Sequence, residues 1–131
     1  MRERLWFSNE EIRASLPQLK SMGFNEAVLF STCNRTELYA FSDQSDFRIE
    51  SLIEFLQTQK RAKETVPAKH FFSFFASGAA EHLFRVASGV DSMIVGDVQI
   101  LAQVKEGYTL AQESGTDGFF MNKLFQFAFH V

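Results

Sequence analysis

Cys33 is the residue whose chemistry stands out, because it is the single cysteine of the chain and lies just after a short strand-like segment, Glu26 to Ser31. Loops at strand ends are exposed and often carry function. Arg35 lies two residues further on, and a nearby cation favours the thiolate, the attacking form of cysteine. Such a cysteine could attack an activated ester and form a thioester. The alternative is that Cys33 is a small buried hydrophobe, as free cysteines commonly are.

Composition restricts the classes of protein to which this chain can belong. Hydrophobic residues make up 46% of it and charged residues 22%, as in a folded domain. Thirteen basic and sixteen acidic residues give a formal net charge of −3, which argues against a globally basic nucleic-acid binder. A single cysteine excludes an intramolecular disulfide and any zinc site with two thiolate ligands. Four basic residues lie close together in the sequence: Lys60, Arg61, Lys63 and Lys69. They could bind nucleic-acid phosphates, or they could simply form a solvated helix end and loop.

Length and segment patterns indicate one domain in the cytoplasm. A chain of 131 residues suits a single core. No apolar run approaches the roughly 20 residues of a membrane span. The start, from Met1 to Glu11, does not have the pattern of a secretory signal. We therefore expect a cytoplasmic protein.

The first element that must position Cys33 is a helix. Ser8 and Glu11 form a capping box, apolar residues follow at helical spacing, and Gly23 stops the pattern. Pro17 lies inside this helix, where it removes a backbone donor and clashes with the preceding turn. We expect a kink or two short helices there.

A hairpin should carry Cys33 itself. Glu26–Ser31 and Thr36–Phe41 have the pattern of strands, separated by a turn from Thr32 to Arg35. Further elements are expected along the chain: a helix from Ser45 or Asp46 to about Lys63, a strand over His70–Phe75, a helix from Gly78 to about Ser88, a helix over Asp97–Ser114 capped by Gly115, and a final helix from about Phe119.

This order of elements predicts the fold class. A helix, a hairpin, a helix and a strand in succession indicate α+β rather than alternating βαβ. They match a split-βαβ arrangement that lacks its first strand. Residues 1–76 would form the sheet and helix core and residues 77–131 a helical extension. Gly107, inside the long helix, should cost about 1 kcal/mol relative to alanine.

Two stretches of the chain resemble the signatures of glutamyl-tRNA reductases. The first is Ser-Thr-Cys-Asn-Arg-Thr-Glu-Leu-Tyr, at Ser31 to Tyr39, and the second runs from His82 to Lys105. They stand in the family's order and at its spacing, and the resemblance covers nearly the whole chain. It implies the N-terminal catalytic domain, which in the family is ferredoxin-like with additional helices.

The resemblance also implies a reaction in tetrapyrrole (porphyrin) biosynthesis. The family reduces the glutamyl ester of glutamyl-tRNA with NADPH to glutamate-1-semialdehyde. Cys33 matches the nucleophile, which displaces tRNA and leaves an enzyme thioester that accepts hydride. Glutamate-1-semialdehyde aminomutase would be a further partner, the full-length family forms homodimers, and no metal is implied.

Other site residues are carried over from the resemblance position by position. His82 matches a family histidine that acts as general base or polarises the carbonyl, although apolar neighbours also suit a histidine at the core edge. Arg35 matches the arginine that binds the glutamate carboxylate, although a solvated turn would also tolerate it. The remaining matches are positions that contact the substrate in the family: Thr32, Asn34, Ser92, Asp97, Val98, Gln99 and Gln103. Alternatively, Thr32 and Asn34 only shape the turn, and the other five belong to a solvated polar face.

Two departures from the family pattern affect these expectations. Gly96-Asp97-Val98-Gln99 replaces the usual Gly-Glu-Pro-Gln, so the acid is one methylene shorter and the rigid proline start of the helix is lost. The seven glycines form no G-x-G-x-x-G, so no cofactor-binding residue is expected in this chain. We expect a fragment without the NADPH and dimerisation domains and without the first strand, which would form at most the thioester, in effect an esterase. The alternative is a non-catalytic fragment that binds tRNA or a partner.

Overall fold

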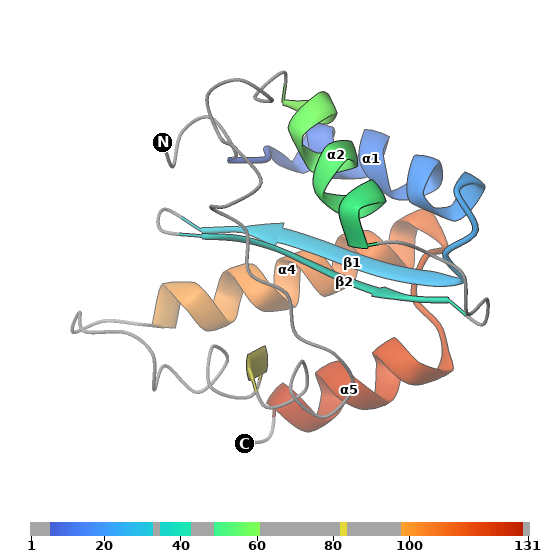
Figure 1. Ribbon diagram of the computed structural model, residues 1–131. Coiled ribbons are helices and arrows are strands. Elements are labelled where there is room, and N and C mark those ends of the chain that lie inside the picture. The colour runs from blue at the N-terminus through green and yellow to red at the C-terminus, as the bar shows by residue number, and fades with distance from the viewer. Residues whose placement is uncertain (1–5, 33–34, 43–48, 61–81, 84–97, 130–131) are drawn as a thin grey trace.

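A computed structural model of the chain describes residues 6–32, 35–42, 49–60, 82–83 and 98–129 (Figure 1). These residues contain the helices α1, α2, α4 and α5 and a two-stranded antiparallel sheet of β1 and β2. The predicted α+β class is therefore confirmed. The strand expected over 70–75, and the helix expected to end near residue 88 apart from residues 82–83, lie outside the described part. Within that part, no helix is both long enough and apolar enough to span a membrane.

Helix α1 (Asn9–Ser21) begins at the predicted capping box. The Glu11 N–H donates to Ser8 Oγ over 3.2 Å, and the Ser8 N–H donates to Glu11 Oε1 over 2.9 Å. α1 is one continuous helix with Pro17 inside it, so of the two expectations at Pro17, two short helices are wrong and a kink stays a prediction. Pro17 is exposed, and the missing backbone hydrogen bond is outweighed by the fully buried leucines of the opposite face, Leu16 and Leu19.

The hairpin has the predicted bounds, with β1 at Glu26–Ser31 and β2 at Thr36–Phe41. The two strands pair in a single register along their full length. Two hydrogen bonds close the turn between them: the Thr32 N–H donates to the Arg35 carbonyl over 2.7 Å, and the Arg35 N–H donates to Thr32 Oγ1 over 3.2 Å. Residues 33 and 34 therefore join two backbone positions that are fixed against each other.

Helices lie on both sides of this sheet. In the view of Figure 1, α1 and α2 (Ile49–Gln59) lie above it, and α4 (Val98–Ser114) and α5 (Phe119–Phe129) lie below it. Every residue of β1 is buried. β1 is therefore the central element of the described core, and side chains at its end are held by packing on several sides.

α4 lies very close to the sheet at Gly107. A Cβ atom there would lie 2.6 Å from the Cβ of Phe30 and 3.0 Å from the carbonyl oxygen of Leu29. The helix could not come so near β1 with a larger residue. The helix penalty predicted for this glycine therefore has a compensating role, because it lets α4 lie directly against the strand that leads to the turn.

The end of α4 and the start of α5 fall where predicted. Gly115 follows α4 with φ +73°, the left-handed conformation of a helix cap. The next residue, Thr116, accepts a hydrogen bond of 2.7 Å at its carbonyl from the N–H of Ala27. This connection therefore covers part of the outer edge of β1.

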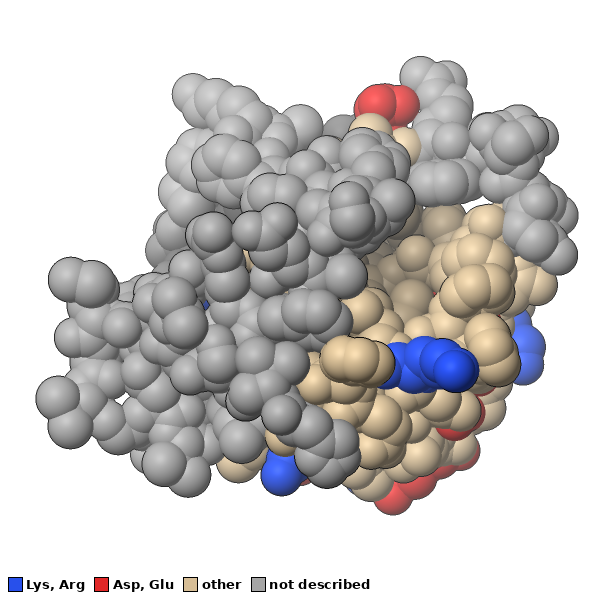
Figure 2. Space-filling view, turned by 90° about the horizontal axis from the view of Figure 1, so that it is seen from below, with Lys and Arg blue, Asp and Glu red and all other residues tan. Residues whose placement is uncertain are grey.

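The surface on the α5 side carries little charge. Three large aromatic residues of α5 are exposed, Phe119, Phe120 and Phe127. Figure 2, seen from below the view of Figure 1, shows a mostly uncharged described surface on which the basic side chains stand apart. Of the basic group noted in the sequence, Lys60 pairs with Glu11 over 2.6 Å. Arg61, Lys63 and Lys69 lie outside the described residues.

Candidate functional site

Cys33 and Asn34 lie outside the described residues, but both ends of their turn are described. Thr32 is buried and hydrogen-bonded to Arg35 through its backbone and its hydroxyl. Chain continuity keeps the Cα of Cys33 about 3.8 Å from that of Thr32. Side chains near this end of the hairpin are therefore the candidates for chemistry with the thiol.

Three such side chains gather around the carboxylate of Glu37, and together with Glu37 they form what we call the Glu37 cluster: Arg35, Glu37, Tyr39 and His82. Glu37 Oε2 lies 3.3 Å from Arg35 Nη1 and 3.0 Å from His82 Nε2. Glu37 Oε1 accepts a hydrogen bond of 2.7 Å from the Tyr39 hydroxyl. One carboxylate thus joins the predicted arginine and the predicted histidine.

The strand itself explains half of this arrangement. Glu37 and Tyr39 lie in β2 and Arg35 directly precedes it; the three are two residues apart, and alternate residues of an extended chain point to the same face of its sheet. The third partner, His82, comes from a segment 45 residues away in the chain. Its neighbour Leu83 is fully buried, so packing of the leucine holds the histidine beside the strand.

Burial makes the ion pair more than a surface contact. The side chain of Glu37 is 12% exposed, that of Arg35 27% and that of His82 26%. An arginine carries five N–H donors in a planar fork. A contact with one carboxylate does not use all of them. The partly exposed guanidinium can therefore hold Glu37 and also receive the carboxylate of a ligand.

Tyr39 anchors the carboxylate from the core side. Its ring stacks on Phe30 at 6.0 Å and meets Phe125 edge-on at 5.4 Å. Burial, followed by the charge of Glu37 and the hydrogen bond to it, raises the pKa of Tyr39. The hydroxyl therefore remains a hydrogen-bond donor well above neutral pH and fixes the position of the Glu37 carboxylate.

The remaining predicted site residues belong to the second signature. Gln103 is half-buried on α4 and lines a pocket at the outer edge of β1. Val98 and Gln99 lie in the first turn of α4, and their side chains are outside the described part. Ser92 and Asp97 lie outside it altogether. The structure thus brings Arg35 and His82 together, and it places Gln103 at a neighbouring pocket.

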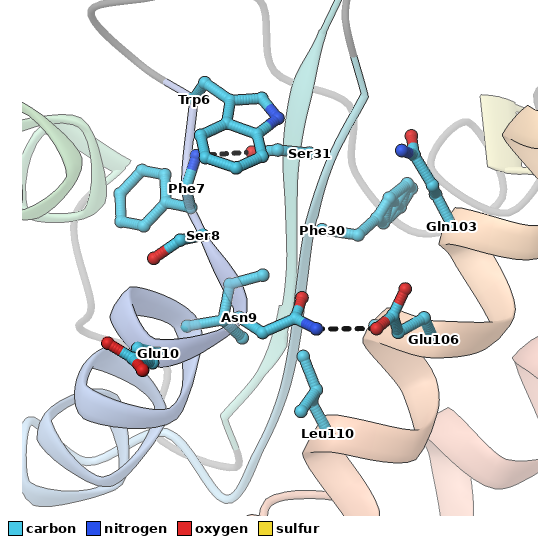
Figure 3. A pocket seen from close by; sticks show the side chains of 12 residues that line it. Trp6, Phe7, Ser8, Asn9, Glu10, Phe30, Ser31, Gln103, Glu106 and Leu110 are labelled. Atoms are coloured by element: carbon cyan, nitrogen blue, oxygen red, sulfur yellow. Dashed lines mark hydrogen bonds between the residues drawn. The ribbon is translucent and has the colours of Figure 1, made fainter.

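This pocket has a volume of about 400 Å³. It is bounded by the segment before α1 and the start of α1, the end of β1 and the middle of α4 (Figure 3). Asn9 Nδ2 donates to Glu106 Oε1 over 2.6 Å, which links α1 to α4. The Phe7 N–H donates to Ser31 Oγ over 3.0 Å, which ties the N-terminal segment to the end of β1.

Glu37 and Tyr39 were not predicted as site residues, although both lie within the first signature. The signal was available, because alternation along β2 places them on the same face as Arg35. Trp6 was also missed, since nothing local relates it to α4. Among the described residues, no group of three His, Cys, Asp or Glu side chains could hold a metal ion.

Fold and site together define a class: an α+β domain with an arginine and a histidine joined by a carboxylate beside a cysteine-containing hairpin turn. Comparison with known sequences identifies the family. The chain belongs to the family described as "Glutamyl-tRNAGlu reductase, N-terminal domain", whose sequence model matches residues 1–131. The resemblance found in the two signatures is therefore confirmed.

Individual relatives agree with this assignment. The glutamyl-tRNA reductase of Chlorobaculum parvum is 39% identical over 132 residues, which cover 100% of this chain and 31% of the relative. That of Geobacillus kaustophilus is 43% identical over 127 residues, covering 96% of this chain and 28% of the relative. The chain spans roughly a third of the length of these curated relatives.

Proposed function

We propose that this chain is the catalytic domain of a glutamyl-tRNA reductase and that it captures the glutamyl group of glutamyl-tRNA on Cys33. The observation that carries the proposal is the bridging of Arg35 and His82 by Glu37, beside the turn that contains Cys33. An anion-binding group and a proton acceptor are thereby held next to a nucleophile.

The proposed reaction is an acyl transfer. His82 accepts the proton of the Cys33 thiol, and the sulfur attacks the carbonyl carbon of the aminoacyl ester. The new C–S bond forms, the C–O bond to the ribose breaks, and the ribose oxygen leaves with the proton returned by His82. The products are a glutamyl thioester on Cys33 and free tRNA.

Arg35 supplies the specificity in this proposal. Its guanidinium pairs with the side-chain carboxylate of the glutamyl group, while Glu37 holds it from the other side. A glutamine side chain presents no charge to this arginine, so glutaminyl-tRNA lacks the charge-assisted contact that glutamyl-tRNA makes, and the site discriminates between them by that contact. Thr32 and Asn34 complete the proposed pocket at the turn. Residues of the second signature form its opposite wall: Ser92, Asp97, Val98, Gln99 and Gln103.

The described residues do not fit NADPH. Their two strands are antiparallel, and in this part of the chain no glycine-rich turn leads from a strand into a helix. The proposal for this chain therefore ends at the thioester. Reduction to glutamate-1-semialdehyde in tetrapyrrole synthesis is proposed for the whole protein, as the family name suggests. Dimerisation and transfer to an aminomutase are proposed for it from the resemblance of the two signatures alone.

We also propose that the sheet is ferredoxin-like, of the split-βαβ type. The observed succession of α1, a hairpin and α2 supports this arrangement. α4 and α5 would then be the helical extension. In this fold, the hairpin positions the thiol at the end of a buried strand, and the extension supplies the wall that carries Gln103.

The test is incubation with radiolabelled glutamyl-tRNA, followed by intact-mass spectrometry of the protein. We expect one glutamyl group per chain, which hydroxylamine removes as it removes thioesters, and none on Cys33→Ser. Arg35→Lys should keep the fold and lose most of the adduct, because the planar fork is lost. An adduct that persists on Cys33→Ser would contradict the mechanism. Retention of tRNA without any adduct on the unmodified chain would favour the alternative function of a binding fragment.

A further inference from the structure

In the proposed acyl transfer, only Gln103 of the pocket at the outer edge of β1 has a role, as part of the wall of the substrate site, and the other lining residues have none. We propose that this pocket binds the terminal adenosine of the aminoacylated tRNA, the nucleoside whose ribose carries the reacting ester. This inference rests on the proposed function and adds to it a site for the leaving group. It assigns Trp6, Gln103 and Glu106 to recognition of a purine base.

Position is the first argument. Ser31 forms part of the pocket wall, and Cys33 follows two residues later. Two Cα–Cα steps limit the separation of these residues to about 7.6 Å. The ester attacked by the thiol is bonded directly to the terminal ribose, so the base on that ribose must lie within one nucleoside's length of the sulfur. The pocket at Ser31 meets this requirement.

Aromatic surface is the second argument. Trp6 lines the pocket and is 45% exposed. Figure 3 shows its indole across the pocket from Phe30 and Gln103. An exposed indole at the mouth of a cavity is a platform on which a base can stack, as in proteins that bind single-stranded nucleic acids.

Polar groups in the pocket select a base over a phosphate. The twelve lining residues include Glu10 and Glu106 but no lysine or arginine, so an anion would be repelled. A neutral base with an amino group meets acceptors instead. The amide of Gln103 can pair with two atoms of adenine, because an amide matches its adjacent amino donor and ring-nitrogen acceptor.

Tertiary contacts form the pocket before any ligand arrives. The Asn9–Glu106 hydrogen bond holds α1 and α4 at one end, and the Phe7–Ser31 hydrogen bond holds the segment that carries Trp6. The volume of about 400 Å³ lies in the range of small-molecule sites. Binding therefore requires little ordering of the protein, which favours a small ligand.

Fluorescence gives the first test, because Trp6 is the only tryptophan of the chain. Titration with adenosine should quench its emission in a saturable way. Uridine, which stacks weakly, should quench it far less, and free glutamate should not. Absence of quenching by adenosine would overturn the proposal. Quenching by glutamate in place of adenosine would overturn it too, by assigning the pocket to the amino acid.

Selectivity gives the second test. The chain is acylated with glutamyl-tRNA or with a simple glutamyl thioester that lacks a nucleoside, and the ratio of the two rates is measured. Trp6→Ala should lower this ratio about tenfold or more, and Trp6→Phe should restore most of it. Phe127→Ala is the matched control, an exposed aromatic on α5 outside the pocket. An unchanged ratio in Trp6→Ala would overturn the proposal.

The two tests separate this inference from the proposed function. If neither substrate acylates the unmodified chain, the acyl-transfer proposal fails and the adenosine titration still decides the pocket. If both substrates acylate it and Trp6→Ala slows them equally, Trp6 has a structural role and only the pocket proposal fails.

Discussion

Two carboxylates on the same face of the same hairpin have opposite kinds of partner. Glu26, at the open end, is 7% exposed and accepts hydrogen bonds from the backbone N–H groups of Met121 and Phe120, over 2.7 and 3.3 Å. Glu37, at the turn end, is bound by side chains, those of Arg35, Tyr39 and His82. Glu26 joins two elements, whereas Glu37 organises groups that can also contact a ligand.

The difference follows from what each partner can do. Backbone N–H groups at the start of a helix have fixed directions and a fixed favourable dipole, so a carboxylate there contributes to stability and little else. The packing around Glu26 has the same character, since a Cβ on Gly118 would lie 2.6 Å from its Cδ. Side-chain partners such as Arg35 can change their contacts without unfolding the chain. Carboxylates bound in that way are better candidates for function.

Replacement of Glu26 should have the largest effect. Glu26→Ala leaves the first N–H groups of α5 without their acceptor, and we expect a loss of about 2–3 kcal/mol in the free energy of unfolding. Urea denaturation measures this change. Glu26→Gln is the control: it retains one acceptor and should lose less. A loss below about 0.5 kcal/mol in Glu26→Ala would mean that the two carboxylates do not differ as proposed.

Replacement of Glu37 should act on chemistry instead. Glu37→Gln keeps an acceptor for Tyr39 but removes the charge that holds Arg35, so we expect acylation by glutamyl-tRNA to slow about tenfold, which corresponds to about 1.4 kcal/mol. The free energy of unfolding should fall by less than about 1 kcal/mol. Glu54→Gln, on an exposed position of α2, should change neither. A large stability loss at normal acylation rate would reverse the assignment.

The sequence was sufficient where the determining pattern is local. Both strands of the hairpin, the capping box of α1 and the start of α5 fall at the predicted residues. Alternation, caps and apolar spacing act over a few residues, and the single sequence contains them. Pro17 is the local exception: it does not divide α1 into two helices, because burial of the opposite helix face outweighs the loss of a backbone hydrogen bond.

Contacts between distant segments could not be predicted in this way. Glu26 caps a helix that begins more than 90 residues later, and Glu37 meets a histidine 45 residues away. The role of Gly107 depends on how closely α4 approaches Phe30. Arg35 and His82 were selected only through the family signatures, and the carboxylate that joins them emerged from tertiary structure.

Tyr39 gives a sharper measure of the Glu37 charge. Burial and then the charge of Glu37 raise the pKa of Tyr39 above its usual value of about 10. The native state therefore holds this proton more tightly, so the resulting stability is present below about pH 10 and is lost as the pH rises further. Glu37→Gln should lower the pH at which Tyr39 ionises. Absorbance titration in a Tyr108→Phe background isolates Tyr39, because the chain has two tyrosines. Ionisation of Tyr39 at the same pH in both proteins, while far-UV circular dichroism shows both still folded, would show that Glu37 exerts no such field.

Removing a partner of Glu11 should have the smallest effect on the free energy of unfolding. Glu11 has both kinds of partner, a lysine side chain and a backbone N–H group, so one remains when the other is lost. Burial acts to raise its pKa, but hydrogen bonds from the Lys60 side chain and the Ser8 backbone outweigh burial and lower the pKa below its ordinary value of 4.5. A lowered pKa stabilises the native state above about pH 4.5, and this stability is lost as the pH falls through the native pKa. Lys60→Met should therefore cost less than about 1 kcal/mol at pH 7, since Glu11 is more than a third exposed.

The pH dependence of stability in Lys60→Met shows how much Lys60 and how much the Ser8 backbone contribute to the lowered pKa of Glu11. The difference in unfolding free energy between Lys60→Met and the unmodified chain should shrink as the pH falls below 4.5, because a protonated Glu11 no longer pairs with the lysine. Lys20→Met is the matched control, since Lys20 Nζ donates to the carbonyl of Gly115 over 3.0 Å and its loss should not depend on pH in this range. If the Lys60 difference also stays constant, the Ser8 backbone bond alone lowers the pKa of Glu11, and Glu11 belongs with Glu26 rather than with Glu37.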